Sequence, residues 1–496
     1  MLGGLITLSK SVLEAYNRSP TRARLGAIAR RMGVKAYAVG GAVRDVAAGR
    51  KVHDWDIVCK DAMRLAAALA RDLGGSFVWL HDSPATARVV VGVHGASVPR
   101  EEIDFSDLRG GNLDEDLRAR DFTINSLAWP VGQEPSPLID PCGGLRDIAT
   151  KTIRANGPAV LAADPLRCLR AYRLAAELDF SIDAVTAQWI SLHAEGLQSV
   201  ACERIGAEIT RLVAPRGLHK RLAQMISSRV LGAILPELGE LRGLMQGRYH
   251  HLDAWDHTLL VLSEIERIAS DPQKTFRRST PFVRDYLSRP EALLRLKLAG
   301  LLHDVGKPGT RAVIAGRIRF LGHADKGAQM AEDVLHRLRL PRSARNAVPG
   351  IISLHMRPLM LVNATEGSPP TLSAVRRLFR DSDPDGMALI VLSVADLLAC
   401  RGPATDPERQ ADNLQTIDAM IAEYETWRSQ REREPLLRGR DLIEELGLVP
   451  GPSFSVILET VERAQTDGEV TNRSQALALA ERLVREGPCG PDRERP

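Results

Sequence analysis

The sequence predicts an α+β head near the amino terminus, followed by a helical remainder. Between residues 37 and 140, short apolar runs alternate with glycine-containing turns, which is typical of alternating strands and helices. From about residue 151 onward, apolar residues recur at helical spacing with few glycines or prolines between them. At about 150 residues per domain, a chain of 496 residues is expected to form roughly three domains.

Composition narrows the class of protein. Hydrophobic residues make up 44% of the chain and charged residues 26%, which excludes a disordered or fibrous protein. The sequence has no apolar run of ~18 residues and no signal peptide at its start, and its six cysteines include no CxxC pair. We therefore expect a cytoplasmic protein with reduced thiols and no membrane partner. A net charge of +4 permits a polyanionic partner, whereas 4% aromatic residues argue against a stacking platform for single-stranded nucleic acid.

The predicted elements follow in chain order. A helical lead is expected at 1–34 and the head at 35–150, with strands at the apolar runs Tyr37–Val39, Trp55–Val58, Val89–Val93 and Ile103–Phe105. A helical neck is expected at 151–246, a histidine-bearing helical domain at 247–405, and a helical tail at 406–496 with the last ~10 residues disordered. Prolines and basic residues within 271–290 favour a basic loop between helices.

Two features of the head point to phosphate chemistry. Gly40 and Gly41 stand between a predicted strand and a helix, where glycines let backbone N–H groups approach a phosphate, although a simple tight turn explains them equally. Asp54 and Asp56 are two residues apart at a strand, so their carboxylates share one face. Such a pair suits a two-metal site for nucleotidyl transfer, with Asp104 as a third carboxylate; solvated surface aspartates are the alternative.

Six motifs in a fixed order carry a family resemblance. They are GGAVRD (Gly40–Asp45), DWD (Asp54–Asp56), RARDFTINSLAW (Arg118–Trp129), IDPCGGLRDI (Ile139–Ile148), DPLRCLRAYRLAAELDF (Asp164–Phe180) and ERIGAEI (Glu203–Ile209). Together they resemble the tRNA nucleotidyltransferase and poly(A) polymerase family in its bacterial-type class, over residues 37–213. The resemblance implies a nucleotidyltransferase head of the DNA polymerase beta type, a helical neck, and the 3′ end of tRNA, ATP and CTP as partners.

The resemblance also assigns roles within the head. It implies that Asp54 and Asp56 hold two magnesium ions and that Asp104 helps to activate the RNA 3′-hydroxyl. Gly40 and Gly41 would cradle the triphosphate, with Arg44 adding charge. Contacts with the ribose and the triphosphate are implied for three residues of the next motif, Arg120, Asp121 and Asn125. Local turn and cap formation explains the same motif without a ligand.

The motif at Asp164 would read the base. A carboxylate that accepts from an exocyclic amino group and a guanidinium that donates to the adjacent ring nitrogen suit cytosine and adenine, and mismatch guanine and uracil. Asp164 and Arg167 supply this pair, and Arg170 and Arg173 extend the same helical stripe toward the phosphates. The alternative is a plain helix start, with Asp164 as its cap.

Three departures from the family pattern bear on the nucleotides added. Ala119 stands where the family has an arginine, and Ala163 where it has a glutamate. The stretch between Asp104 and Arg118 is short. In the family this region holds a flexible loop linked to addition of the terminal A, and relatives that add only CC have a shortened loop. Addition of CCA, of CC alone or of A alone therefore remains open at this point.

A second pattern lies downstream. The order of His257, His303-Asp304, His323, His355 and Asp396 resembles the HD phosphohydrolase superfamily, although a lone histidine on an apolar helix is more often a core residue. In that resemblance His257, His303, Asp304 and Asp396 hold a divalent metal (Mn, Fe, Co, Ni or Mg), and His323 and His355 add a second metal or bind phosphate. It implies phosphatase or 2′,3′-cyclic phosphodiesterase activity. His250 and His251 are assigned no role.

The sequence thus predicts a template-independent nucleotidyltransferase that adds C, A or both to the 3′ end of tRNA, with an HD-domain phosphohydrolase. A poly(A) polymerase is the first alternative, because it shares the head and its two-metal chemistry. An HD-type metal phosphohydrolase with a vestigial RNA-binding head is the second.

Overall fold

The computed structural model describes residues 20–52, 54–82, 84–92, 101–132, 138–364, 370–431, 435–466 and 468–486. The chain divides into two compact units, with the boundary after Pro236. The start of the helical lead and the last ten residues, for which disorder was predicted, lie outside the described residues. In the described part of the chain, no helix combines the length and the hydropathy that a membrane crossing requires.

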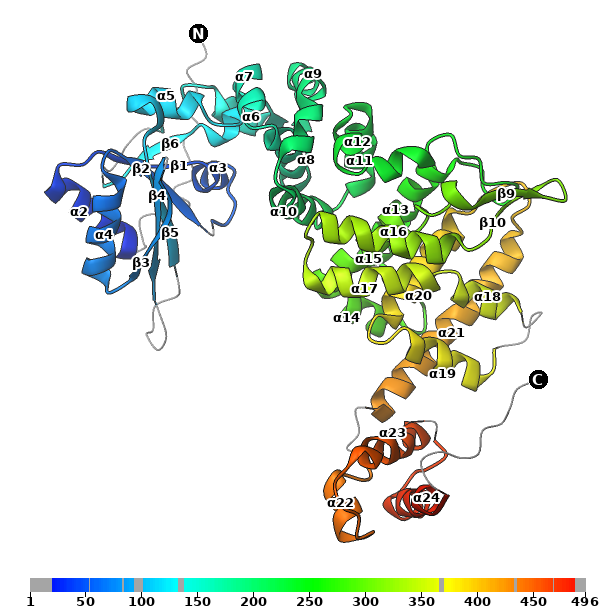
Figure 1. Cartoon of the computed structure of the whole chain (residues 1–496). Coiled ribbons are helices and arrows are strands. Elements are labelled where there is room, and N and C mark those ends of the chain that lie inside the picture. Colours follow the sequence, from blue (N-terminus) through cyan, green and yellow to red (C-terminus); the bar gives the residue numbers. More distant parts are fainter. Residues whose placement is uncertain are drawn as a thin grey trace. The chain divides into compact units, whose positions relative to one another are not determined.

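The first unit is built on a six-stranded sheet with the strand order β3-β4-β5-β2-β1-β6 (Figure 1). The strands are β1 (Ala36–Val39), β2 (Trp55–Cys59), β3 (Ser76–Asp82), β4 (Ala85–Val91), β5 (Glu101–Asp107) and β6 (Ala128–Pro130). β2 and β5 run parallel, and the other neighbours run antiparallel. The four predicted apolar runs form β1, β2, β4 and β5, while β3 and β6 were not predicted.

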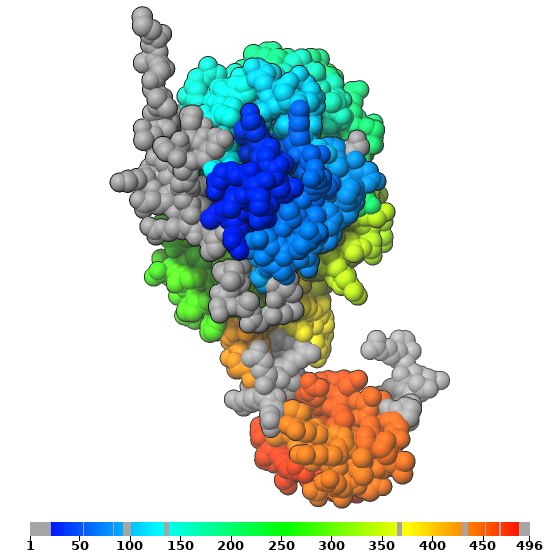
Figure 2. Space-filling model, turned by 90° about the vertical axis from the view of Figure 1, so that its left-hand side faces the viewer, coloured from blue at the N-terminus to red at the C-terminus, as the bar shows by residue number. Residues whose placement is uncertain are grey.

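Alternation along the strands gives the sheet two different faces. Ile57, Val89 and Phe105 are buried in one core together with apolar residues of the helices. That core includes α2 (Pro20–Met32), α3 (Gly41–Ala47) and α4 (Ala62–Leu73). Figure 2 shows the surface of α2 in dark blue beside the paler blue of the head residues that follow it. The intervening strand residues, which include Asp56, Glu102 and Asp104, lie on the other face.

Helices complete the first unit. They are α5 (Leu113–Arg118), α6 (Gly144–Ala149), α7 (Pro158–Ala163), α8 (Leu166–Leu178), α9 (Ala184–His193), α10 (Cys202–Val213), α11 (Leu218–Ser227) and α12 (Val230–Ile234). Most residues of α8 are buried, and this helix packs against α10. The neck is helical as predicted except for a parallel pairing of two short strands, β7 (Thr152–Ile153) and β8 (Ser181–Ile182).

The second unit is helical around α20 (Gly386–Ala399), which is almost entirely buried and packs against several other helices. These include α13 (Ala254–Ser270), α15 (Pro290–Leu302), α17 (Arg342–Leu354) and the long α21 (Pro407–Arg431) that follows it. Outer helices are α14 (Thr280–Ser288), α16 (His323–Arg337), α18 (Arg357–Asn363) and α19 (Leu372–Asp381). Three tail helices, α22 (Gly439–Glu444), α23 (Pro452–Thr466) and α24 (Arg473–Glu486), share a small core of their own and form the orange and red surface in Figure 2.

Two sequence predictions for this unit were wrong. The basic segment 271–290 is not a loop, because it contains α14, whose apolar side Val283 and Leu287 is buried. The histidine-bearing region is not wholly helical, because it includes a hairpin of β9 (Arg311–Ile314) and β10 (Arg317–Phe320). Arginine alternates with apolar residues in β10 but not in β9, and both strands are only four residues long and largely exposed.

Candidate active site and metal centre

Carboxylates from two neighbouring strands meet on the open face of the head. Asp56 on β2 is directly opposite Asp104 on β5 in the parallel pairing. Asp54 stands one residue before β2, on the same side as Asp56 by strand alternation. Asp56 is exposed and Asp104 half-buried. The sheet therefore brings the three predicted acidic residues to one face, as the spacing of Asp54 and Asp56 suggested.

The Asp104 carboxylate is bound by Arg88, a residue that the sequence did not single out. Its Nε donates to Asp104 Oδ1 at 2.8 Å and its Nη2 to Oδ2 at 3.0 Å, while Nη1 donates to Glu102 at 2.8 Å. This two-point contact fixes the carboxylate and neutralises its charge. Among the described residues, Asp54 and Asp56 have no ion pair with an arginine.

The chemistry of this donor set fits magnesium. Although Asp56 keeps an accessible surface, the protein atoms around its carboxyl reduce its hydration and raise its pKa, and Asp104 and Asp54 raise it further against the opposing effect of Arg120. Magnesium prefers such carboxylate oxygens, so Asp54 and Asp56 are suitable ligands.

The two glycines border this acidic face. Gly40 has a φ of +74°, a left-handed conformation that favours glycine. A Cβ atom at Gly40 would lie 3.1 Å from Asp56 Oδ2 and 3.2 Å from Arg120 Nη1. Arg120 in turn is held by the buried Asp116, which accepts from its Nε at 3.0 Å and from its Nη2 at 2.9 Å. Backbone, carboxylate and guanidinium thus converge at Gly40.

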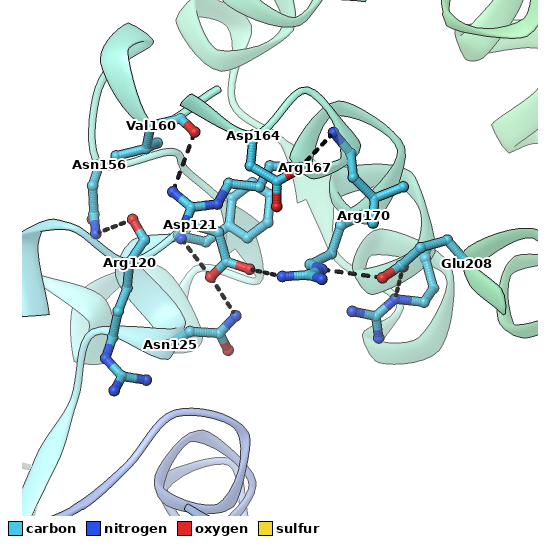
Figure 3. A network of polar contacts seen from close by, with 12 residues as sticks. Arg120, Asp121, Asn125, Asn156, Val160, Asp164, Arg167, Arg170 and Glu208 are labelled. Carbon is cyan, nitrogen blue, oxygen red and sulfur yellow. Dashed lines mark hydrogen bonds and ion pairs between the residues drawn. The ribbon is translucent and has the colours of Figure 1, made fainter. Parts of the chain in front are cut away.

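A chain of polar contacts starts from Arg44 on α3. Its Nη1 donates to Asn125 Oδ1 at 2.9 Å, and Asn125 Nδ2 donates to Asp121 Oδ1 at 2.9 Å. Asp121 is buried and also receives Arg170 Nη1 at 3.2 Å (Figure 3). Burial alone would raise the pKa of Asp121, but Arg170, the Asn125 hydrogen bond and Arg167 together lower it, so the carboxylate is charged.

This chain of polar contacts continues into the neck through Glu208 on α10. Arg170 Nε donates to Glu208 Oε1 at 3.1 Å, and Arg173 donates from Nε to Glu208 and from Nη1 to Glu177. Arg173 is only 5% exposed, and its guanidinium is enclosed by these carboxylates. This environment fits a positioning role for Arg173, and a contact with phosphate stays a prediction. Glu208 lies in the motif ERIGAEI, but no residue pattern in the sequence links it to Arg170 and Arg173.

Asp164 and Arg167 lie where α7 ends and α8 begins. Asp164 is half-buried; its Oδ1 accepts from Leu166 N at 3.3 Å and its Oδ2 from Arg204 Nη2 at 2.8 Å. Arg167 Nη1 donates to the backbone carbonyl of Val160 at 3.2 Å (Figure 3) and to that of Ala119 at the same distance. Burial lowers the pKa of Arg167, and its buried Nε lacks a hydrogen-bond partner among the described residues. The two residues of the proposed base-reading pair therefore lie next to each other. The hydrogen bond by which Asp164 would cap α8, from Leu166 N, is long.

The predicted HD residues converge in the second unit from five helices. His257 comes from α13, His303 and Asp304 from the end of α15, His323 from the start of α16, His355 from the end of α17, and Asp396 from α20. Ligand atoms of His257, His303 and Asp396 lie within 4.8 Å of one another, and so do those of Asp304, His323 and His355. The sequence prediction grouped the same six residues, with a different division between core and second site.

Three imidazoles are oriented in the same way. The Nδ1 atoms of His303, His323 and His355 lie 2.9, 2.8 and 2.6 Å from the backbone carbonyls of Gly300, Phe320 and Ile352. A carbonyl only accepts, so each Nδ1 carries a proton, and each Nε2 presents a lone pair while its imidazole is neutral. These Nε2 atoms are buried and lack hydrogen-bond partners among the described residues. Metal-binding histidines have this arrangement, so the residues fit a divalent cation.

Within this cluster, the Asp304 carboxylate contacts both a lysine and a histidine. Lys307 Nζ donates to its Oδ2 at 2.6 Å, and His303 Nε2 lies 3.2 Å away. Burial opposes the charged form, but His303 and Lys307 outweigh it and hold the pKa of Asp304 well below its ordinary value. Burial and His303 lower the pKa of His355 to about 4, which keeps this imidazole neutral. Lys307 was not predicted; it follows His303-Asp304 by one helical turn.

Family models match three consecutive regions. The Poly A polymerase head domain matches residues 36–154, the "Probable RNA and SrmB- binding site of polymerase A" matches 179–241, and the HD domain matches 254–399. A CC-adding tRNA nucleotidyltransferase of Thermus thermophilus is 35% identical over 457 residues, which cover 90% of this chain and 92% of the relative. The chain belongs to the tRNA nucleotidyltransferase and poly(A) polymerase family. It is a nucleotidyltransferase with a polymerase beta-type head and an HD domain.

Other family members match over similar lengths. An A-adding tRNA nucleotidyltransferase of Deinococcus radiodurans is 32% identical, covering 91% of this chain and 96% of the relative. A CC-adding enzyme of Geobacter sulfurreducens is 33% identical, covering 94% and 95%. The solved structure of the Thermotoga maritima CCA-adding enzyme complexed with tRNA matches with a TM-score of 0.60 at 21% identity, over 96% of this chain and 98% of that one. This likeness confirms the fold.

Proposed function

We propose that this nucleotidyltransferase adds cytidines to the 3′ end of tRNA and does not add the terminal adenosine. The observation that carries the choice is the short connection between β5 and α5, residues 108–112. The family resemblance links terminal A addition to a flexible loop in this region. Similarity to two CC-adding enzymes, at 35% and 33% identity, supports the same choice.

Hydrogen bonds attach this connection to neighbouring residues, so little of its length is free to form a loop. Leu108 N donates to the Cys59 carbonyl at 3.2 Å, and Arg109 N donates to Asp116 Oδ1 at 3.2 Å. Asn112 caps α5 by accepting from Glu115 N at 3.0 Å. The segment thus ties β5 directly to the helix whose Asp116 holds Arg120.

In the proposed reaction, Asp54 and Asp56 hold magnesium, which supplies charge neutralisation for the transferring phosphoryl group. The backbone at Gly40 and Gly41 and the side chain of Arg44 bind the triphosphate. Asp104 orients the RNA 3′-hydroxyl, and its contact with Arg88 sets where that carboxylate points.

Base selection in this proposal rests on Asp164 and Arg167. The Asp164 carboxylate accepts from the exocyclic amino group of cytosine, and Arg167 donates to the adjacent ring nitrogen in place of one of its carbonyl contacts. Uracil offers a carbonyl and an N–H at the same positions, which leaves both protein groups mismatched. Each unpaired polar group costs about 1–3 kcal/mol.

Primer extension tests the proposed function. The enzyme is incubated with one tRNA transcript that lacks CCA, a second that ends in CC, and an unstructured RNA, each with a single labelled nucleotide. We expect two cytidines on the first transcript and no adenosine on the second. Efficient A addition to the second would replace this proposal with CCA or A addition, and repeated A addition to the unstructured RNA would support a poly(A) polymerase.

A second activity is proposed for the HD domain: divalent-metal-dependent hydrolysis of phosphate esters on RNA ends or nucleotides. The buried Nε2 atoms of His323 and His355, which have no hydrogen-bond partner among the described residues, support it. His303→Ala combined with Asp304→Ala should abolish metal-dependent release of phosphate, or opening of a 2′,3′-cyclic phosphate, and should spare nucleotide addition. If both activities fall while circular dichroism is unchanged, the two sites are not independent. If only hydrolysis is detectable in the intact enzyme, the head is vestigial.

A further inference from the structure

A third group of potential metal ligands lies beside the HD cluster and shares one residue with it. Ligand atoms of His250, His257 and Cys400 lie within 4.8 Å of one another. Cys400 Sγ is 3.7 Å from Nδ1 and 4.0 Å from Nε2 of His250. The rings of His250 and His257 meet edge to face with centroids 4.6 Å apart. Sequence reasoning gave His250 no role, because it precedes the HD pattern.

The backbone holds two of these ligands together. Gly402 N donates to the Tyr249 carbonyl at 2.8 Å, and Ala404 N donates to the Arg248 carbonyl at 3.1 Å. A Cβ atom at Gly402 would clash with the carbonyl oxygen of Arg248, so the two segments approach as closely as a glycine permits. The residues beside this clamp are His250 and Cys400. Their proximity is therefore a built feature of the fold.

The shared residue has a buried nitrogen without a partner. His257 is fully buried, and its Nε2 lies 2.8 Å from Asp396 Oδ1. When Nε2–H donates to that carboxylate, Nδ1 presents a lone pair. Nδ1 is buried and has no hydrogen-bond partner among the described residues. An imidazole that donates one N–H to a carboxylate and offers the other nitrogen is the usual form of a metal-binding histidine.

We propose that His250, His257 and Cys400 form a zinc-binding site beside the HD ligand set, with which it shares His257, so that His257 serves one metal at a time. Two imidazole nitrogens and one thiolate are the ligands that Zn²⁺ prefers, and three protein ligands leave its fourth tetrahedral position to water. HD residues offer only nitrogen and oxygen, so the thiol is what distinguishes the new site. On binding, the Cys400 thiol releases its proton to solvent, and no electron transfer is involved.

Cobalt substitution tests the site in the full-length, reduced protein. Co²⁺ bound to a thiolate gives a sulfur-to-metal charge-transfer band in the near ultraviolet, whereas Co²⁺ held by histidine and carboxylate does not. We expect this band in the wild type and in the His303→Ala, Asp304→Ala variant, which lacks two of the HD ligands but keeps His257. Cys400→Ser should remove the band and one equivalent of zinc per chain, as measured by elemental analysis. Cys202→Ser, a half-buried cysteine of the first unit, is the matched control and should keep both.

Several results would overturn the proposal. Absence of the band in the wild type would do so, and so would a band of full intensity in Cys400→Ser. Loss of the band in the His303→Ala, Asp304→Ala variant, with unchanged circular dichroism, would assign the metal to the HD centre. Should Cys400→Ser fail to fold, His250→Gln decides the question: it retains the thiol, and the proposal requires weaker Co²⁺ affinity and a shifted visible spectrum. An unchanged spectrum in His250→Gln refutes the site.

Discussion

Replacing Asp164 with alanine separates base reading from helix capping. The carboxylate has two contacts in the protein, a 3.3 Å bond from Leu166 N and an ion pair with Arg204 at 2.8 Å. The first is long for a cap, and the second joins side chains that are 51% and 25% exposed. Exposed ion pairs are worth roughly 0–1 kcal/mol. We therefore expect Asp164→Ala to lower the free energy of unfolding by about 1 kcal/mol or less.

The expected effect on nucleotide choice is larger. If Asp164 accepts from the amino group of cytosine, its loss removes a charged acceptor worth about 1–3 kcal/mol of discrimination against uracil. At 1.4 kcal/mol per factor of ten, the ratio of kcat/KM for CTP over UTP should fall roughly 5- to 150-fold. The assay measures kcat/KM for each nucleotide on tRNA without CCA, alongside a thermal melt.

Arg204→Ala is the matched control for this prediction. It removes the same ion pair but keeps the carboxylate, so its stability should change by a similar amount while the CTP-to-UTP ratio stays the same. An unchanged ratio in Asp164→Ala, together with a lower Tm, would show that Asp164 serves only the start of α8.

Three further predictions follow from the two units. Asp56→Ala should reduce cytidine addition by more than about tenfold, or ~1.4 kcal/mol, in primer extension while tRNA binding persists; a smaller loss contradicts its assignment as a metal ligand. Glu208→Gln breaks a buried ion pair and should lower the free energy of unfolding in urea by about 3 kcal/mol, whereas a change within about 0.5 kcal/mol would contradict the network. In metal-free protein, His250 and His355 have folded-state pKa values of about 4 against 6.5 for an unperturbed histidine, so the unfolded chain binds their protons first. Stability of the second unit should therefore fall as the pH drops from about 6.5 toward 4, and His355→Gln should reduce that slope in urea titrations at several pH values.

Local patterns in the sequence were sufficient to predict an element where buried residues alternate along a strand or recur at helical spacing. Alternation placed Asp56 on the face opposite Ile57, and the apolar run before His303 predicted the helix that presents it. The strand β3 escaped prediction because its apolar residues Phe77–Leu80 are consecutive and exposed, so they show neither alternation nor burial. In α14 a proline lies at the start of the helix, where the sequence alone suggests a loop. Only the folded structure shows that one side of this helix is buried.

Contacts between residues far apart in the sequence could not be predicted from it. Glu208 meets Arg173 across 35 positions, and Cys400 meets His250 across 150. Each pairing depends on the packing of helices or on a close backbone approach, which no local pattern encodes. The same limit applies to Arg88, because the strand register that sets it beside Asp104 is a property of the folded sheet.

The contacts of the first unit explain how two parts of one nucleotide site can stay in register. Arg44, beside the predicted triphosphate cradle, is joined through Asn125 and Asp121 to Arg170. Arg170 lies on α8, one turn beyond the proposed base-reading Arg167, so a shift of this helix would stretch contacts with buried Asp121. Asp121 is buried and Arg170 is half-buried, so breaking this pair would leave a buried carboxylate without one of its partners. We therefore expect the triphosphate and base subsites to keep a fixed spacing, and this spacing, rather than any template strand, would select the incoming base.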